Sequence, residues 1–126
     1  MTTTEKNAEI ARWMGAWQAE EGYWYISELE KGFKLDELKY HSDWNWLMGC
    51  VEKIQLIPSY DKDKFGTIVK IEGRNCSIKS DNYGDKNKNY SKSLYFNANY
   101  SGQTKIEAVH EAVYQFIVWY NQQQKL

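Results

Sequence analysis

The sequence is poor in the residues that mark linkers, disulfide frameworks and metal sites. Its 126 residues include one proline, eight glycines, two cysteines and two histidines. So little proline and glycine excludes a Pro/Gly-rich linker, and we expect a single domain over residues 1–126. Cys50 and Cys76 lack CxxC spacing, and His41 and His110 lack HxxxH spacing, so we expect no zinc site or other metal centre.

Long apolar runs and a leader segment are missing as well. No stretch approaches the roughly 18 consecutive apolar residues of a membrane span. The start, MTTTEKNAEI, lacks the basic and apolar regions of a signal peptide. We therefore expect a protein of the cytoplasm that does not contact a membrane, with both thiols free in a reducing environment.

The chain does not carry a large charge of either sign. Sixteen Lys and Arg against seventeen Asp and Glu give a formal net charge of −1, which argues against binding to duplex DNA. Residues 61–92 contain eight basic and five acidic side chains, whereas residues 1–60 contain six basic and ten acidic ones. The basic middle suits either a small anionic ligand or a solvated lysine-rich loop.

Aromatic residues, in contrast, are abundant. They make up 16% of the chain and include six Trp and ten Tyr. Large rigid rings are used in cores, at interfaces and for stacking on flat ligands. A core of this size accounts for about half of them, so the others are candidates for contacts outside the core.

Sequence patterns predict three helices. Thr2 and Glu5 have the spacing of a capping box and open the first helix, which Gly15 ends in a left-handed conformation. Ser42 is predicted to be the N-cap of the second helix. Thr104 opens the third helix with the same capping-box spacing, and its apolar residues then keep helical phase for about four turns.

Strand signals form two hairpins and one further strand. Residues 16–19 and 23–27 flank one turn, and residues 67–72 and 76–80 flank the turn Gly73-Arg74-Asn75. Residues 94–97 can return as another strand. Residues 28–41 fit neither period and are left as loop or irregular strand. These elements predict an α+β fold, an antiparallel sheet of about four or five strands packed with three helices.

No constellation of residues predicts catalysis. His41-Ser42-Asp43 has the residue types of a catalytic triad, but adjacent residues rarely reach the geometry that a triad requires. Cys50 falls near the buried side of the second helix, where an inert core thiol is expected. No glycine pattern resembles a phosphate-binding loop. We therefore predict a protein without enzymatic activity or cofactor.

Three apolar residues fall outside the predicted buried stripes. Trp46 lies about 160–180° round the second helix from the buried stripe, which consists of Trp44, Leu47, Met48 and Val51. Val118 and Trp119 lie beside the stripe of the last helix. Such residues are covered by another part of the chain, by a second copy or by a ligand. From these faces we predict a homo-oligomer, a dimer or larger, with Trp46, Val118 and Trp119 in the interface.

The run YHSDWNWLMGCVEKI (40–54), the later hairpin and the closing KIEAVHEAVYQFIVWYNQQ (105–123) resemble small proteins common in phages, prophages and mobile elements of gut bacteria. They are similar to the phage alpha-beta-alpha sandwich domain, and the resemblance covers most of the chain in order. It implies an accessory protein made in an infected bacterial cytoplasm. Phage proteins of this size often act by stoichiometric binding, including sequestration of host immune signals derived from nucleotides.

We therefore predict a non-enzymatic protein that binds and sequesters a small anionic, nucleotide-derived ligand, as a counter-defence sponge. In such a site, rings stack on a base while basic side chains hold phosphate. The residues predicted to do so are Tyr25, Trp46, Tyr83 and Tyr90 for stacking, with Arg74, Lys88 and Lys92 for charge. Two alternatives stay open: a module that inhibits or adapts a host protein, and a binder of single-stranded nucleic acid.

Overall fold

The structure, a computed structural model, describes residues 2–20, 23–25, 32–57, 67–80 and 96–124. Within these ranges the helices are α1 (Thr3–Trp13), α2 (Trp44–Gln55) and α3 (Lys105–Gln124), with a short 3-10 helix η1 (Leu35–Glu37). The strands are β1 (Trp17–Glu20), β2 (Tyr23–Tyr25), β3 (Phe33–Lys34), β4 (Thr67–Glu72), β5 (Asn75–Ser80) and β6 (Phe96–Ser101). The predicted α+β class and its three helices are confirmed. The strands, however, form two three-stranded antiparallel sheets, β1-β2-β3 and β4-β5-β6, instead of one sheet.

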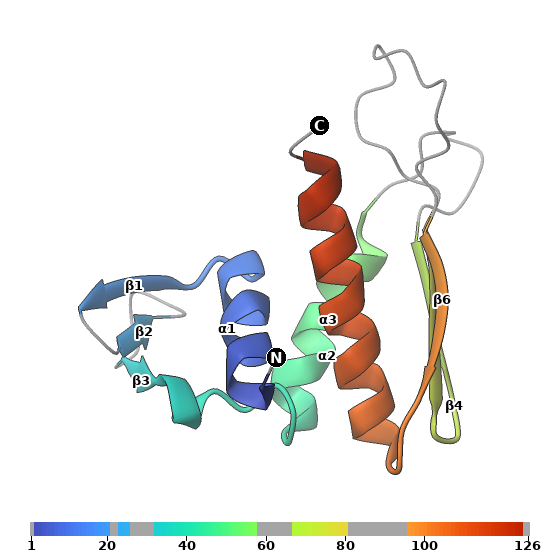
Figure 1. Cartoon of the computed structure of the whole chain (residues 1–126), viewed down its shortest axis with the longest axis horizontal. Coiled ribbons are helices and arrows are strands. Elements are labelled where there is room, and N and C mark those ends of the chain that lie inside the picture. Colours follow the sequence, from blue (N-terminus) through green and yellow to red (C-terminus); the bar gives the residue numbers. More distant parts are fainter. Residues whose placement is uncertain (1, 21–22, 26–31, 58–66, 81–95, 125–126) are drawn as a thin grey trace.

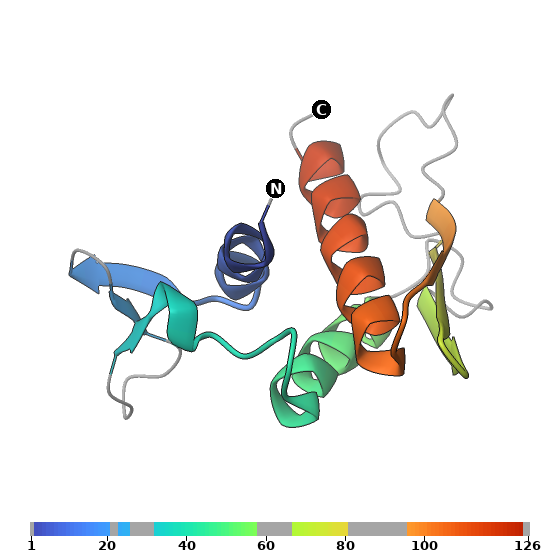
Figure 2. The ribbon, with the colours of Figure 1, turned by 60° about the horizontal axis from the view of Figure 1, so that its bottom comes forward.

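Helix α3 runs through the middle of the molecule, with sheet β4-β5-β6 on one side and α1 on the other (Figure 1). Sheet β1-β2-β3 lies beyond α1, at the opposite end from the other sheet, and Figure 2 shows α2 packed beside α3. Both sides of α3 are therefore covered by the chain itself. This explains why six of its residues are fully buried: Ala108, Val109, Ala112, Val113, Phe116 and Ile117.

The first sheet is completed by a segment whose structure the sequence did not predict. Phe33 pairs with Trp24 and Lys34 pairs with Tyr23, so residues from 28–41 add a third strand to the predicted hairpin. This strand has only two residues, too few for an alternating pattern to be visible in the sequence. Helix η1 follows at once, and the Glu37 carboxylate accepts a hydrogen bond from the Lys34 N–H at 2.9 Å.

The second sheet contains the hairpin with the clearest sequence signal. Strands β4 and β5 pair over their full length, from Thr67 opposite Ser80 to Glu72 opposite Asn75. The turn therefore has two residues instead of the predicted three, because Asn75 already belongs to β5. Gly73 occupies the first turn position with φ 56°, as type II′ hairpins require.

Two of the three predicted helix caps are confirmed. The hydroxyls of Thr2 and Thr104 each accept a hydrogen bond from the backbone N–H three residues later, at 3.2 Å in both cases. The prediction of Ser42 as the third cap is wrong. The N–H groups of Ser42 and Asp43 both donate to the Lys39 carbonyl, so the preceding turn extends through Ser42. Asp43 is the cap, and its carboxylate accepts from the N–H two residues later at 2.8 Å.

We expect Gly15→Ala to lower the free energy of unfolding by about 1 kcal/mol. Gly15 has φ 94° and no atom within 4 Å of the position of an added Cβ, so backbone strain alone sets the cost. Gly49→Ala is the matched control and should instead raise the free energy of unfolding. Gly49 lies inside α2, where the added methyl group is 3.9 Å from Met14 Cε, and the better helix propensity of alanine should raise the free energy of unfolding by about 0.5–1 kcal/mol. Urea unfolding measures both, and stabilisation by both substitutions would contradict the left-handed backbone at Gly15.

Both cysteines are free, as predicted, and both are buried. Burial raises the pKa of Cys50 to about 12 and that of Cys76 to about 11. Because the thiolate is the reactive form, both side chains act as small core residues at neutral pH. None of the helices in the described ranges has the length and apolar character needed to cross a membrane.

Candidate functional site

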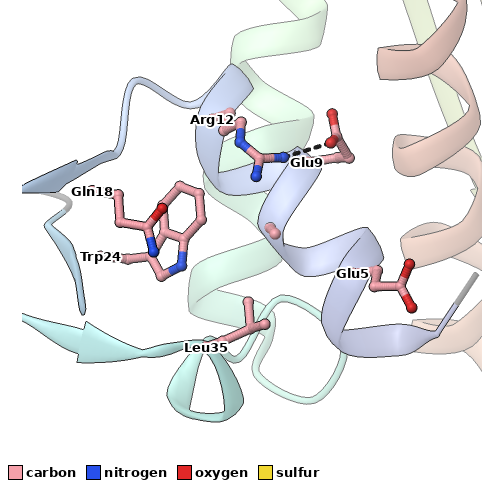
Figure 3. A pocket seen from close by; sticks show the side chains of 7 residues that line it. Glu5, Glu9, Arg12, Gln18, Trp24 and Leu35 are labelled. Carbon is pink, nitrogen blue, oxygen red and sulfur yellow. Dashed lines mark hydrogen bonds and ion pairs between the residues drawn. The ribbon is translucent and has the colours of Figure 1, made fainter. Parts of the chain in front are cut away.

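A cleft of about 380 Å³ lies between helix α1 and sheet β1-β2-β3 (Figure 3). Small-ligand sites typically have volumes of roughly 300–1,000 Å³, so the cleft is large enough for a compact molecule. It is lined by Glu5, Ala8, Glu9 and Arg12 of α1, Gln18 of β1, Trp24 of β2 and Leu35 of η1. The site is therefore built entirely from residues near the start of the sequence.

Helix α1 presents two different faces. Glu5, Ala8, Glu9 and Arg12 are spaced i, i+3, i+4 and i+7, which places them in one stripe along the helix, and this stripe lines the cleft. Ile10, by contrast, is fully buried in the core cluster. The helix thus joins the core on one side and forms one wall of the cleft on the other.

Trp24 forms the apolar floor of the cleft. Strand alternation turns its indole toward α1, leaving it 4% exposed, and turns Tyr23 and Tyr25 to the outer face of the sheet. The guanidinium carbon of Arg12 lies 5.1 Å from the centroid of the indole ring, a cation–π distance. Within the described residues, no hydrogen bond of the indole N–H is found.

The walls of the cleft carry more negative than positive charge. Arg12 Nη1 lies 2.5 Å from Glu9 Oε1, and the two side chains are 55% and 37% exposed. Glu5 accepts a hydrogen bond from the Thr2 hydroxyl at 3.0 Å and forms no ion pair within the described residues. The lining residues thus carry two carboxylates and one guanidinium, and only the Glu9 carboxylate is paired with Arg12, while that of Glu5 points away from Trp24 (Figure 3). The arrangement favours a ligand that is neutral or positively charged.

The predicted ligand-binding residues do not converge in the described part of the chain. Tyr25 lies on the outer face of the first sheet, away from the cleft. Trp46 packs edge-on against Phe33 and Tyr40, with ring centroids 5.3 Å and 5.2 Å apart. Arg74 is exposed in the β4–β5 turn, which belongs to the sheet at the opposite end of the molecule. The other predicted residues, Tyr83, Lys88, Tyr90 and Lys92, lie outside the described ranges.

The residues predicted for an oligomer interface are covered, at least in part, within the chain. Phe33 and Tyr40 pack against Trp46, so its position opposite the predicted stripe does not leave it uncovered. The ring of Trp119 lies 5.2 Å from that of Phe96, and Val118 is partly buried against the core. The predicted oligomer was meant to cover these side chains, but other segments of the same chain already do so in part. The homo-oligomer itself stays a prediction.

A buried polar network joins both histidines of the chain to one asparagine. Asn7 is fully buried on α1, and its amide nitrogen donates to the Leu38 carbonyl at 3.1 Å and to Nδ1 of His41 at 2.8 Å. Its amide oxygen accepts from Nε2 of His110 at 2.8 Å. The Leu38 carbonyl accepts only, and this orients the Asn7 amide. Nδ1 of His41 must therefore accept, and the proton of its neutral ring lies on Nε2.

Charged groups surround this network on the α3 side. Lys6 Nζ lies 2.6 Å from Glu111 Oε2 and 5.2 Å from the ring centroid of Tyr114. Burial, together with His41 and Lys6, lowers the pKa of His110 to about 4. Burial raises the pKa of Glu111, but hydrogen bonds from Lys6 and Gln115 outweigh it and lower the pKa below its usual value. His110 is therefore neutral near pH 7, and the network links α1, residues 38–41 and α3.

Sequence reasoning missed both the cleft and the network. The stripe Glu5-Ala8-Glu9-Arg12 was a visible signal, because four residues in helical phase outside the buried stripe mark a second face. Trp24, in contrast, lies in a predicted strand, but its packing against Arg12 of α1 joins two segments that no local pattern connects. Asn7 and His110 are 103 residues apart, and no local pattern connects them. Within the described residues, no group of three or more His, Cys, Asp or Glu side chains is placed to hold a metal ion.

Comparison of the chain with protein-family models, curated proteins and solved structures finds no match. The resemblance to the phage alpha-beta-alpha sandwich domain therefore stays a prediction.

Proposed function

We propose that this protein works by binding a small molecule in the cleft between α1 and sheet β1-β2-β3, without catalysing a reaction. The observation that carries the proposal is the cleft itself. It has a volume of about 380 Å³, an indole floor, and four polar side chains among its lining residues. Small-ligand sites commonly combine an apolar surface with a few convergent polar groups that orient the ligand.

Two observations favour binding over catalysis. The proton on Nε2 of His41 means that its neutral ring offers a donor, not a general base, to a molecule approaching from solvent. The raised pKa values of Cys50 and Cys76 make both thiols poor nucleophiles at neutral pH. His41 and both cysteines are thus held in unreactive forms.

We expect Gln18→Phe to weaken small-molecule binding by at least about tenfold, because the new ring fills the cleft from an exposed position on β1. Lys34→Phe is the matched control. Lys34 is exposed and pairs with Tyr23, so the same ring is placed on the outer face of the same sheet. Native mass spectrometry of protein purified from a bacterial lysate identifies a retained molecule, and calorimetry with that molecule measures both variants. Equal losses in the two variants, or no molecule retained, would contradict the proposal.

A second candidate function, a protein-interaction module, is favoured by the outer face of the first sheet. Trp17 is 41% and Tyr23 37% exposed on this face. The rings of Trp17 and Tyr25 lie 6.1 Å apart and 22° from parallel. Exposed aromatic side chains are enriched at protein interfaces. Because this face is opposite the cleft, substitution of Trp17 separates loss of a protein partner from loss of a small ligand.

The nucleotide-derived anion predicted from the sequence requires a different site from the cleft. Arg74 supports such a site, because it is exposed in a turn whose carbonyl accepts a hydrogen bond from the Gly102 N–H at 3.1 Å. A turn held in this way presents a guanidinium suited to phosphate. The sponge role, and the single-stranded nucleic acid alternative, depend on this end of the molecule and on residues outside the described ranges.

A further inference from the structure

The cleft already contains a cation that belongs to the protein. The guanidinium of Arg12 lies over the indole of Trp24, at 5.1 Å from the ring centroid, and pairs with the Glu9 carboxylate at 2.5 Å (Figure 3). An aromatic face with a carboxylate beside it is the arrangement by which proteins bind guanidinium and alkylammonium groups. Arg12 therefore occupies a site whose chemistry suits a small cation.

Arg12 is weakly held in this position. Its side chain is 55% exposed, and its ion pair with Glu9 joins neighbouring turns of one helix at the surface. Exposed ion pairs and exposed cation–π contacts are individually weak. Within the described residues, Glu9 is the only hydrogen-bond partner of the guanidinium. The side chain can therefore turn into solvent, leaving its place on the indole to a ligand.

The remaining charge of the cleft selects the sign of that ligand. Once Arg12 turns outward, the residues that line the cleft include two carboxylates, those of Glu5 and Glu9, and no cation. The two glutamates are four residues apart, one above the other on α1. A positively charged ligand gains from both carboxylates, whereas an anion is repelled by both.

We propose that the cleft binds a small organic cation, with a guanidinium or methylated ammonium group that replaces the Arg12 guanidinium on Trp24. Glu9 pairs with the charge, Glu5 adds negative charge farther along α1, and the Gln18 amide lines the cleft as a partner for a polar group attached to the cation. This inference rests on the proposed function of the cleft and specifies the chemical class of its ligand. Arg12 acts as an internal competitor that keeps the indole covered while the ligand is absent.

The test is an NMR titration of the whole protein with methylguanidinium chloride and tetramethylammonium chloride, and with adenosine monophosphate as the anionic probe. The readout is the indole N–H signal of Trp24, identified by its loss in Trp24→Phe. Arg12→Ala removes the competitor, and we expect it to bind both cations about tenfold more tightly than the unmodified protein. Arg12→Gln keeps most of the side chain but not the charge, and should change affinity in the same direction.

Two carboxylate variants complete the experiment. Glu9→Gln should weaken cation binding by about tenfold, because the pairing charge is lost while the shape is kept. Glu52→Gln, at an exposed position on α2 that does not line the cleft, should leave it unchanged. Circular dichroism of every variant checks that the fold is kept.

The possible outcomes separate the two proposals. Unchanged or weaker cation binding in both Arg12 variants overturns the inference, as does the absence of a saturable shift with either cation. A saturable shift with adenosine monophosphate alone overturns the cation class but supports the cleft as a ligand site. No shift with any probe, together with no molecule retained in native mass spectrometry, removes both proposals.

Discussion

Phe116→Ala is expected to lower the free energy of unfolding by about 3–5 kcal/mol, the largest effect of any single substitution considered. Phe116 is fully buried at the centre of an aromatic cluster that joins α1, α3 and β6. Its ring centroid lies 6.4 Å from that of Trp13, 5.5 Å from Phe96, 5.7 Å from Trp119 and 6.0 Å from Tyr120. Truncation leaves a cavity between three elements, and rigid rings on every side cannot collapse into it.

Chemical denaturation of Phe116→Ala measures this loss against a surface truncation. Leu56→Ala is the control, because Leu56 is 81% exposed and its removal should change the free energy of unfolding by less than about 0.5 kcal/mol. Phe116→Leu fills most of the volume and should fall between the two. A loss below about 1.5 kcal/mol in Phe116→Ala would contradict the packing of these rings around one centre.

The parts of the fold that could be predicted are those coded by local chemistry. The N-cap hydroxyls of Thr2 and Thr104 and the left-handed Gly15 mark helix ends through hydrogen bonds and backbone angles within a few residues. The second cap was misassigned because Ser42 and Asp43 are both good caps, and the choice depends on the turn before them. Local competition of this kind is resolved only in the folded chain.

The arrangement of the sheets and the candidate site depend on contacts that local patterns do not encode. The two-residue strand β3 forms because Phe33 pairs with Trp24 and packs on Trp46, and neither contact leaves a period in the sequence. Because β3 is present, Trp46 belongs to an internal cluster of aromatic rings and is not left uncovered. It also completes the sheet that forms one side of the cleft. The unpredicted strand therefore explains the extra strand and the covering of Trp46, whereas the division into two sheets arises because, in the described part of the chain, neither β1 nor β2 pairs with β4, β5 or β6.

The protein should lose about 2–3 kcal/mol of its free energy of unfolding as the pH falls from about 6.5 to 4. In the unfolded chain His110 has the ordinary histidine pKa of 6.5, whereas in the folded protein burial, with His41 and Lys6 nearby, lowers this pKa to about 4. Between these values the unfolded chain binds a proton that the folded protein does not, so acid favours unfolding. Glu111 also faces His110, but its carboxylate contributes a loss only below its ordinary pKa of 4.5.

His110→Gln isolates the histidine from the other acid-sensitive groups. In the unmodified protein the Asn7 oxygen accepts a hydrogen bond from His110 Nε2 at 2.8 Å. The glutamine amide still offers a donor to this oxygen, but glutamine does not titrate. Urea unfolding at a series of pH values should show a loss between pH 6.5 and 4 that is less than half of that in the unmodified protein. An equal loss in both proteins would place the acid sensitivity elsewhere. A smaller loss identifies the Asn7 network as the point where acid loosens the attachment of α1, and with it the cleft, to the rest of the core.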